Sequence, residues 1–331
     1  MALLTIDGFD TYATEANFSQ NSNFYNILSV TPSTTTPYGE GKSAEVGYGG
    51  FTIRSPSGVQ PILIFGMSVL GGDDGTQISF QNGTTINYYI KINIESSRLD
   101  VFNADTILLG STDFGTWNVA IWNYLEVKGD GGTGVADGNL YIQINGELQL
   151  TINDTLLGFS DNLQISNFTP LFLDNFYLCD GTTGDVVPNN DFLGDCQVTT
   201  MFPTADLNVQ FTTTGSSNWQ TVGTDDPNNI SVNNYSDVVN AFDIFNTSGS
   251  IPLTSTIYGV TISSYAFKNS SGVRSVGNFT NSLSSNYNYN PVWLSPSPQY
   301  INNVSAYDPA WSVAWTPTTV NGLAIGYEVI T

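Results

Sequence analysis

The sequence predicts an all-β protein made of two successive domains. Alternating runs rich in Val, Ile, Tyr, Phe, Trp and Thr recur along the whole chain, whereas the 3.6-residue periodicity of amphipathic helices is nearly absent. The length of 331 residues leaves room for two β domains, each with its own core. Hydrophobic residues at 40% and aromatic residues at 13% are sufficient to pack such cores, which excludes a disordered chain.

The first domain is predicted over residues 1–180. Its strand-like runs are Gln60–Val69, Thr76–Phe80, Tyr88–Glu95, Arg98–Phe102, Thr106–Leu109, Trp117–Lys128, Gly138–Ile144, Glu147–Ile152, Leu163–Ser166 and Phe172–Cys179. The dipeptide Asn145-Gly146 separates two of these runs and favours the positive φ angles of a type I′ hairpin turn. Runs of this length and spacing in one continuous segment predict an antiparallel sandwich or jelly roll.

A change of composition marks the end of the first domain. Residues 181–196 carry Gly, Pro and Asn without periodicity, so we place a linker there. Strand-like alternation returns in a second domain over residues 197–331. Its runs are Gln197–Phe202, Ser217–Val222, Val238–Phe245, Thr256–Lys268, Gly272–Phe279 and Leu323–Ile330. The second domain is therefore also predicted to be all-β.

The charge balance excludes several classes of partner. Asp and Glu number 29 against 7 Lys and Arg, which gives a formal net charge of -22 at pH 7. Nucleic acids and anionic membrane surfaces both attract clustered basic residues, and the basic residues of this chain are scattered. The most apolar stretch, Pro61–Leu70, is much shorter than the ~20 residues that cross a bilayer. The segment Met1–Asp10 lacks the basic and apolar regions of a secretory signal, so we expect assembly in the cytoplasm without membrane insertion.

The chain contains no His, which removes the commonest catalytic base. Ser-His and Cys-His nucleophile systems and imidazole-ligated metals are thereby excluded. A glycosidase needs two carboxylates that face one cleft, yet nothing in the sequence pairs Glu95, Glu126 and Glu147, which lie in separate predicted strands. We therefore expect a protein that is not an enzyme and needs no cofactor, with a glycan-degrading sandwich enzyme as the alternative.

Two acidic loop segments, Gly71–Gly75 and Asp130–Gly138, offer oxygen ligands of the kind that Ca²⁺ takes. Neither has the Asp-x-Asp-x-Asp-Gly spacing of a calcium loop, and Asp-Gly is ordinary in turns. We therefore predict no metal site, with a calcium-dependent lectin as the alternative. Cys179 and Cys196 can either form a disulfide or remain free thiols, since two cysteines do not make a disulfide framework.

Aromatic residues are the remaining candidates for binding. The loop over residues 287–293 reads Tyr-Asn-Tyr-Asn-Pro-Val-Trp and is difficult to bury. Exposed rings next to Asn side chains make platforms for sugars, because the ring packs on C–H groups while the amide bonds to hydroxyls. Tyr287, Tyr289 and Trp293 are therefore the predicted contact residues for a partner protein or a glycan.

Four segments together resemble the concanavalin-A-like (laminin-G-like) jelly-roll family. They are Leu3–Phe9, Trp122–Val127, Leu140–Gly146 and Leu173–Leu178. In that family a Trp-x-x-[Ile/Val/Leu]-Glu strand lies next to a hairpin that ends in Asn-Gly. The resemblance implies an antiparallel jelly-roll sandwich for residues 1–180. Asn175 departs from the Asp-Asp pair of the family, which argues against a calcium site at that edge.

A second and more specific resemblance covers most of the chain and keeps the order of its motifs. The motifs Asp191–Cys196, Met201–Asp206, Ser217–Trp219, Ala241–Asp243 and Asp308–Ala310, followed by Trp315, resemble a recurrent virion protein of tailed bacteriophages. Cys196 and Phe202 stand where that family more often has Val or Ile and Leu, respectively. The family is described as structural proteins of the virion or its tail region, and none of these motifs is catalytic.

The resemblance implies a non-enzymatic structural component of a tailed-phage virion. We expect it on the tail or a tail fibre, where the jelly roll would adhere to a host-surface glycan. Capsid decoration, in which the protein stabilises the head, is the alternative. The implied partners are other virion proteins, the chain is expected to form a homo-oligomer, and the second domain would provide attachment or interaction within the particle.

Overall fold

The computed structural model describes residues 3–21, 24–25, 27, 29–132, 137–155, 157–181, 190–223 and 231–331. The chain divides into two compact units. The first consists of Met1–Asp10, Thr14–Ser19 and Asn23–Val198, and the second of Thr11–Ala13, Gln20–Ser22 and Thr199–Thr331. Residues 190–196, which composition assigns to a linker, thus belong to the first unit.

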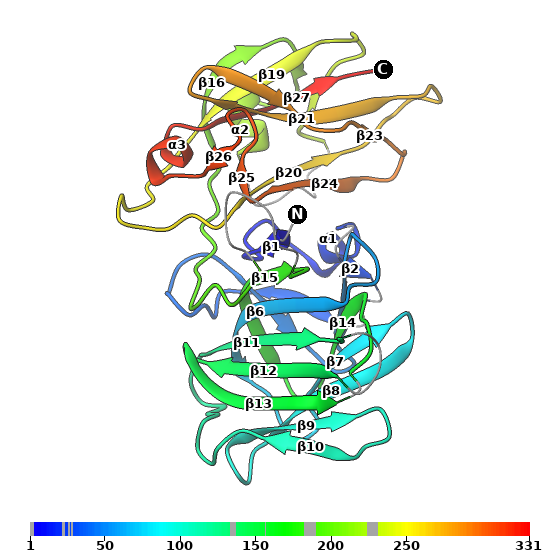
Figure 1. Ribbon diagram of the computed structural model, residues 1–331. Helices are drawn as coiled ribbons and strands as arrows, with labels where there is room; N and C mark the ends of the chain where they lie inside the picture. Colours follow the sequence, from blue (N-terminus) through cyan, green and yellow to red (C-terminus); the bar gives the residue numbers. More distant parts are fainter. Residues whose placement is uncertain are drawn as a thin grey trace. The chain divides into compact units, whose positions relative to one another are not determined.

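Two antiparallel sheets form the first unit (Figure 1). The eight-stranded sheet contains β1 (Leu3–Asp7), β3 (Val30–Ser33), β4 (Ser43–Val46), β6 (Ile62–Gly71), β11 (Asn123–Asp130), β12 (Gly138–Ile144), β13 (Glu147–Thr155) and β15 (Leu171–Cys179). Its order is β13-β12-β11-β6-β15-β4-β3, and β1 pairs with β15. The seven-stranded sheet contains β2 (Phe24–Tyr25), β5 (Phe51–Arg54), β7 (Gln77–Asn82), β8 (Thr85–Asn93), β9 (Arg98–Asn103), β10 (Leu108–Ser111) and β14 (Asn162–Ser166). Its order is β10-β9-β8-β7-β14-β5-β2, and a short helix, α1 (Glu15–Ser19), precedes β2.

The apolar faces of these two sheets pack against each other in the core. The ring centroids of Phe65 on β6 and Phe80 on β7 lie 5.6 Å apart, and Phe80 stacks on Tyr88 of β8 at 4.2 Å. Gly129 on β11 leaves room for the Tyr88 hydroxyl, because a Cβ at residue 129 would collide with it. The predicted antiparallel jelly-roll sandwich is thereby confirmed.

The Asn145-Gly146 turn joins β12 to β13, as the sequence predicts. Asn145 has φ 53° and Gly146 has φ 80°, the positive values of a type I′ turn. Asn145 also contacts the neighbouring strand β11, because its Oδ1 accepts a hydrogen bond from the Tyr124 backbone N–H at 2.8 Å. Its own backbone N–H donates to the Tyr124 carbonyl at 2.8 Å. The turn therefore fixes the register of the hairpin and its contact with β11 together.

A buried carboxylate holds the end of the first unit against the outer face of the eight-stranded sheet. Glu126 of β11 points away from the core and is nevertheless 0% exposed. Its Oε1 accepts hydrogen bonds from the Tyr177 hydroxyl at 2.5 Å and from the backbone N–H groups of Leu193 and Gly194, both at 2.9 Å. Burial raises the pKa of Glu126, and these hydrogen bonds oppose the rise.

Two further contacts fix the same segment. Lys128, on the same face of β11 as Glu126, forms an ion pair with Asp191 at 3.2 Å. The Val198 backbone N–H donates to Asn175 Oδ1 at 2.8 Å. Asn175 has φ 52° at an irregularity in the pairing of β15 with β6, and Asn tolerates this left-handed conformation better than most residues. Asn175 thus adopts the backbone conformation of the bulge, and its side chain holds the backbone of Val198 by a hydrogen bond.

The second unit contains a six-stranded antiparallel sheet. Its strands are β16 (Pro203–Val209), β19 (Phe242–Thr247), β21 (Ser275–Ser282), β22 (Ser285–Asn288), β23 (Val292–Trp293) and β27 (Ala324–Val329). The order is β16-β19-β27-β21-β22, and β23 also pairs with β21. Smaller two-stranded sheets join β17 (Thr212–Thr213) to β18 (Asn234–Tyr235), β20 (Val260–Ala266) to β24 (Gln299–Ser305) and β25 (Tyr307–Asp308) to β26 (Val313–Ala314), and the short helices are α2 (Asn218–Val222) and α3 (Pro317–Asn321). The predicted all-β character of the second domain is confirmed.

A second buried carboxylate organises this unit. Asp243 of β19 is 0% exposed. Its Oδ1 accepts from the backbone N–H groups of Gln210 at 2.7 Å and Phe211 at 2.9 Å. Its Oδ2 accepts from Asn218 Nδ2 at 2.9 Å and from the Tyr327 hydroxyl at 3.1 Å. One side chain therefore ties the loop after β16, helix α2 and strand β27 to β19.

Two of the predicted strands in the second domain are wrong. Residues 217–222 contain α2, which begins after the N-cap residue Ser217 in a Ser-x-x-Gln sequence typical of helix starts, although no side-chain capping hydrogen bond forms there. Residues 197–202 contain no strand, and β16 begins at Pro203, where pairing with Thr247 of β19 starts.

The three helices of the described residues are short, and none of them has the length and apolar character that a membrane-spanning helix needs.

We expect Asp243→Asn to destabilise the second unit by about 2–4 kcal/mol, because the amide presents an N–H₂ group to donors that need an acceptor. Hydrogen-exchange mass spectrometry of β19 and β27 measures this loss separately from the first unit. Asp237→Asn removes the same charge from an exposed position and serves as the control. Equal losses of protection in the two variants would contradict the role assigned to Asp243.

Candidate functional site

The outer face of the seven-stranded sheet carries polar and aromatic side chains in two cross-strand rows. Residues directly opposite each other on antiparallel strands point to the same face, so the register defines the rows. The first row consists of Phe102, Tyr89, Ser79, Gln164 and Thr52. The second row consists of Ser111, Asp100, Lys91, Gln77 and Ser166. We call these two rows the row face.

An aromatic pair stands at one end of the first row. Tyr89 of β8 and Phe102 of β9 are direct neighbours, with ring centroids 5.2 Å apart and ring planes 16° apart. Both side chains are half-buried, so part of each ring remains exposed. Two nearly parallel rings on a strand surface form a rigid apolar platform for a ligand.

Hydrogen bonds within the sheet fix the amide side chains beside this platform. Gln77 Nε2 donates to Ser79 Oγ at 2.6 Å, and Gln81 Nε2 donates to Gln164 Oε1 at 2.5 Å. Among the residues that the structure describes, Gln77 Oε1 and Gln164 Nε2 have no hydrogen-bond partner. The face therefore offers an acceptor and a donor that are already held in place.

The carboxylate of the second row is satisfied by its neighbours. Asp100 accepts hydrogen bonds from Ser111 Oγ at 2.6 Å and Asn93 Nδ2 at 2.8 Å, and Arg98 Nε lies 2.8 Å from Asp100 Oδ1. Burial alone would raise the pKa of Asp100, but the two hydrogen bonds and Arg98 outweigh it and lower the pKa. Asp100 is therefore ionised at neutral pH.

Sequence reasoning missed the row face, although one part of its signal was present. Lys91 alternates with the buried Ile90 and Ile92, which places Lys91 on the polar side of its strand. Alternation does not say which strands are neighbours, so it cannot bring β8 beside both β7 and β9. Only the pairing of the strands assembles the rows.

The predicted contact residues of the second unit are only partly brought together. The rings of Tyr287 and Tyr289 lie edge to face with centroids 5.1 Å apart, and burial raises the pKa of Tyr289. Tyr287 pairs with Thr280 of β21 and Trp293 pairs with Ser275. These two partners on β21 are an odd number of residues apart, so their side chains point to opposite faces of the sheet. Trp293 therefore lies on the face opposite to that of Tyr287. Trp293 is the most exposed of the three, at 62%.

The three glutamates considered for glycoside hydrolysis lie apart. Glu126 is covered by the 190–198 segment, Glu95 is exposed in the turn between β8 and β9, and Glu147 is exposed at the start of β13. The structure brings no two of these carboxylates to one cleft. Their positions therefore do not form the carboxylate pair that hydrolysis of a glycosidic bond requires.

The acidic loop at 71–75 uses a carboxylate to close a turn. Asp73 Oδ1 accepts from the Gly75 backbone N–H at 2.9 Å and from Thr76 Oγ1 at 3.1 Å. In the part of the chain that the structure describes, no three His, Cys, Asp or Glu side chains lie close enough to share a metal ion. Cys179 and Cys196 are free thiols.

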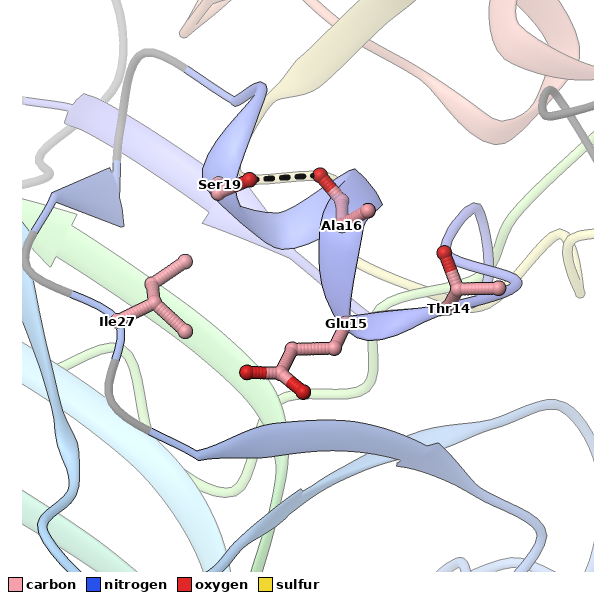
Figure 2. Close-up of a pocket in the computed structure, with 5 residues that line it drawn as sticks. All are labelled: Thr14, Glu15, Ala16, Ser19 and Ile27. Atoms are coloured by element: carbon pink, nitrogen blue, oxygen red, sulfur yellow. Dashed lines mark hydrogen bonds between the residues drawn. The ribbon is translucent and has the colours of Figure 1, made fainter.

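An open pocket lies beside α1 (Figure 2). It is lined by Thr14, Glu15, Ala16, Ser19 and Ile27. The Ser19 hydroxyl donates to the Ala16 carbonyl at 2.8 Å and is thus already engaged within the helix. The lining offers a single carboxylate and no aromatic ring, so it presents fewer ligand-binding groups than the row face.

Comparison with solved structures finds partial likenesses. A carbohydrate-binding module CBM66 from Bacillus subtilis matches 47% of this chain and 96% of its own, with 12% identity and a TM-score of 0.34. Domain 4 of AbnA, an arabinanase from Geobacillus stearothermophilus solved with arabinotriose, matches 54% of this chain and 93% of its own, with 13% identity and a TM-score of 0.37. The catalytic domain of a glycoside hydrolase family 131 protein from Coprinopsis cinerea matches 59% and 99%, with 14% identity and a TM-score of 0.35. No protein-family model and no curated protein matches the sequence. Similarities this low assign no function to this chain.

Asp174 of β15 predicts an unusual pH dependence. Asp174 is 6% exposed, and burial, with Asp10 and Asp7 nearby, raises its pKa from 3.8 to about 7. The folded state therefore binds this proton more tightly than the unfolded state, so the stabilisation is complete below about pH 4 and is lost as the pH rises through about 7. We expect Asp174→Asn to be more stable than the parent protein at about pH 8, by on the order of 2–4 kcal/mol, and equal to it at about pH 4.

Thermal unfolding of the two proteins across this pH range measures the difference. Glu147→Gln removes an exposed carboxylate from the same unit and controls for the change in net charge. A constant difference between Asp174→Asn and the parent protein from about pH 4 to about pH 8 would show that Asp174 does not titrate in this range.

Proposed function

We propose that the first unit binds a glycan on the row face. The observation that carries the proposal is the combination of the Tyr89–Phe102 ring pair with the ordered amides of Gln77 and Gln164 on one sheet face. Sugar rings present apolar C–H groups to aromatic rings, while their hydroxyl groups exchange hydrogen bonds with amides and hydroxyls. The row face provides both kinds of group, with Gln77 on the strand next to Tyr89 and Gln164 one strand further.

The shape of the face favours a chain of sugars over an enclosed small molecule. Each row crosses five strands, and neighbouring strands are about 4.8 Å apart, so a row extends over about 19 Å. Its residues lie on strands of the core sheet and not on loops, which keeps their spacing fixed. Thr52, Ser79 and Asp100 are buried, so a bound chain of sugars would contact the larger, half-buried side chains of the rows.

We propose further that this binding attaches a tailed-phage virion to a glycan on its host. The motif resemblance supports this context, and the structure gives one motif a physical role, since Leu193 and Gly194 of the Asp191–Cys196 motif donate to Glu126. In this proposal the protein is an oligomeric component of the tail or a tail fibre that contacts other virion proteins.

We propose that the protein acts by binding and not by catalysis. The absence of His from the sequence and the burial of Glu126 under residues 193–194 support this view. A general acid must reach the leaving oxygen of its substrate, which Glu126 does not do in this arrangement.

Replacing the ring of Tyr89 tests the proposed face. We expect Tyr89→Ala to lower the affinity for the bound glycan at least about tenfold, because the apolar platform is lost, while Tyr89→Phe retains most of it. A glycan array identifies the ligand, and isothermal titration calorimetry with the full chain measures the affinity. Tyr235→Ala, which truncates an exposed ring in the second unit, is the matched control.

The same titration distinguishes the row face from the predicted loop. Loss of binding in Trp293→Ala with no loss in Tyr89→Ala would move the glycan site to the second unit and refute the proposal. Labelling of particles by antibodies in electron microscopy tests the location, with tails labelled if the proposal holds. Labelled heads would instead indicate capsid decoration.

A further inference from the structure

We infer that the glycan bound by the row face is anionic and carries carboxylate groups. This inference rests on the proposed function and concerns the chemical class of the ligand at the same face. The chain has only 7 Lys and Arg against 29 Asp and Glu. Three of those seven cations, Arg54, Lys91 and Arg98, project from one side of the seven-stranded sheet.

The register places all three cations on the same face. Lys91 is a member of the second row, opposite Asp100 on one side and Gln77 on the other. Arg98 lies two residues before Asp100 on β9, and Arg54 lies two residues after Thr52 on β5. Side chains two residues apart on a strand point to the same face. Lys91 therefore lies within the row face, and Arg98 and Arg54 lie at its margin.

The one carboxylate in the rows does not neutralise Lys91. Both oxygens of Asp100 are engaged, Oδ1 by Ser111 and Arg98 and Oδ2 by Asn93. Within the described ranges, no carboxylate lies within ion-pair distance of Lys91 Nζ. Lys91 is half-buried and lies between Gln77 and Asp100 in the second row, two residues from Tyr89 on the same strand. Among the described residues its ammonium group forms no ion pair.

An ammonium group in this position has a definite chemical preference. It carries three donors and no acceptor, and its strongest hydrogen bonds are made to ionised oxygens. Charges elsewhere on the protein are screened beyond about 8 Å at physiological ionic strength, so the net charge of -22 does not prevent a local contact with an anion. A sugar that stacks on Tyr89 and carries a carboxylate would satisfy Lys91 in the same binding mode.

The probe is a panel of uronic-acid, sialic-acid and sulfated glycans, in which each carboxylated member is paired with its carboxyl-reduced or desialylated form. We expect the charged members to bind the full chain, the neutral forms to bind at least about tenfold more weakly, and affinity to fall as salt is raised. Lys91→Gln should lower affinity for the charged glycan about fivefold or more and flatten the dependence on salt. Lys268→Gln removes one positive charge from the second unit and should change neither.

The outcomes separate the two proposals. Equal binding of charged and neutral forms, with Lys91→Gln unchanged, would overturn the inference and leave the glycan face standing. Preference for sulfated glycans over carboxylated ones would keep an anionic ligand but overturn the assignment of carboxylate. Failure of every glycan to bind, or binding that survives Tyr89→Ala, would overturn the proposed face and this inference with it.

Discussion

Each unit depends on one buried carboxylate that accepts backbone N–H groups from a segment outside its sheet. Glu126 binds the N–H groups of Leu193 and Gly194, and Asp243 binds those of Gln210 and Phe211. Irregular backbone near a core must find hydrogen-bond partners, and a buried carboxylate is costly unless donors surround it. The carboxylate oxygens Glu126 Oε1 and Asp243 Oδ1 provide these partners, which fixes where the 190–198 segment and the loop after β16 lie.

The carboxylates of this chain have different structural roles, which depend on their surroundings. Asp73 closes a turn, Glu126 and Asp243 anchor irregular segments, and Asp100 balances Arg98 beside an open face. In Asp100 the neighbouring donors lower the pKa in spite of burial, whereas in Asp174 burial dominates and raises it to about 7. Composition alone treats these groups as equal, and only their surroundings separate them.

The core and the row face are built from the same strands. On β8 the side chains of Ile90 and Ile92 face the other sheet, while Tyr89 and Lys91 face outward. The outward residues are held in register by the packing of the inward ones, so the spacing of the rows follows from the core. A binding surface of this kind needs no loop to order and presents its groups in a fixed array.

The class of the fold and its local turns follow from the amino-acid sequence alone. Alternation predicted the strands of the sandwich, and Asn145-Gly146 predicted the hairpin, because both signals depend on neighbouring residues alone. Alternation did not predict the helix at 218–222, because its signal was the Ser-x-x-Gln sequence that begins at the N-cap residue Ser217. The partners of Glu126 and the assembly of the row face depend on tertiary structure. In the row face, Ser79 of β7 lies between Tyr89 of β8 and Gln164 of β14. Pairing between residues so distant in sequence is set by the packing of whole sheets, which no local pattern encodes.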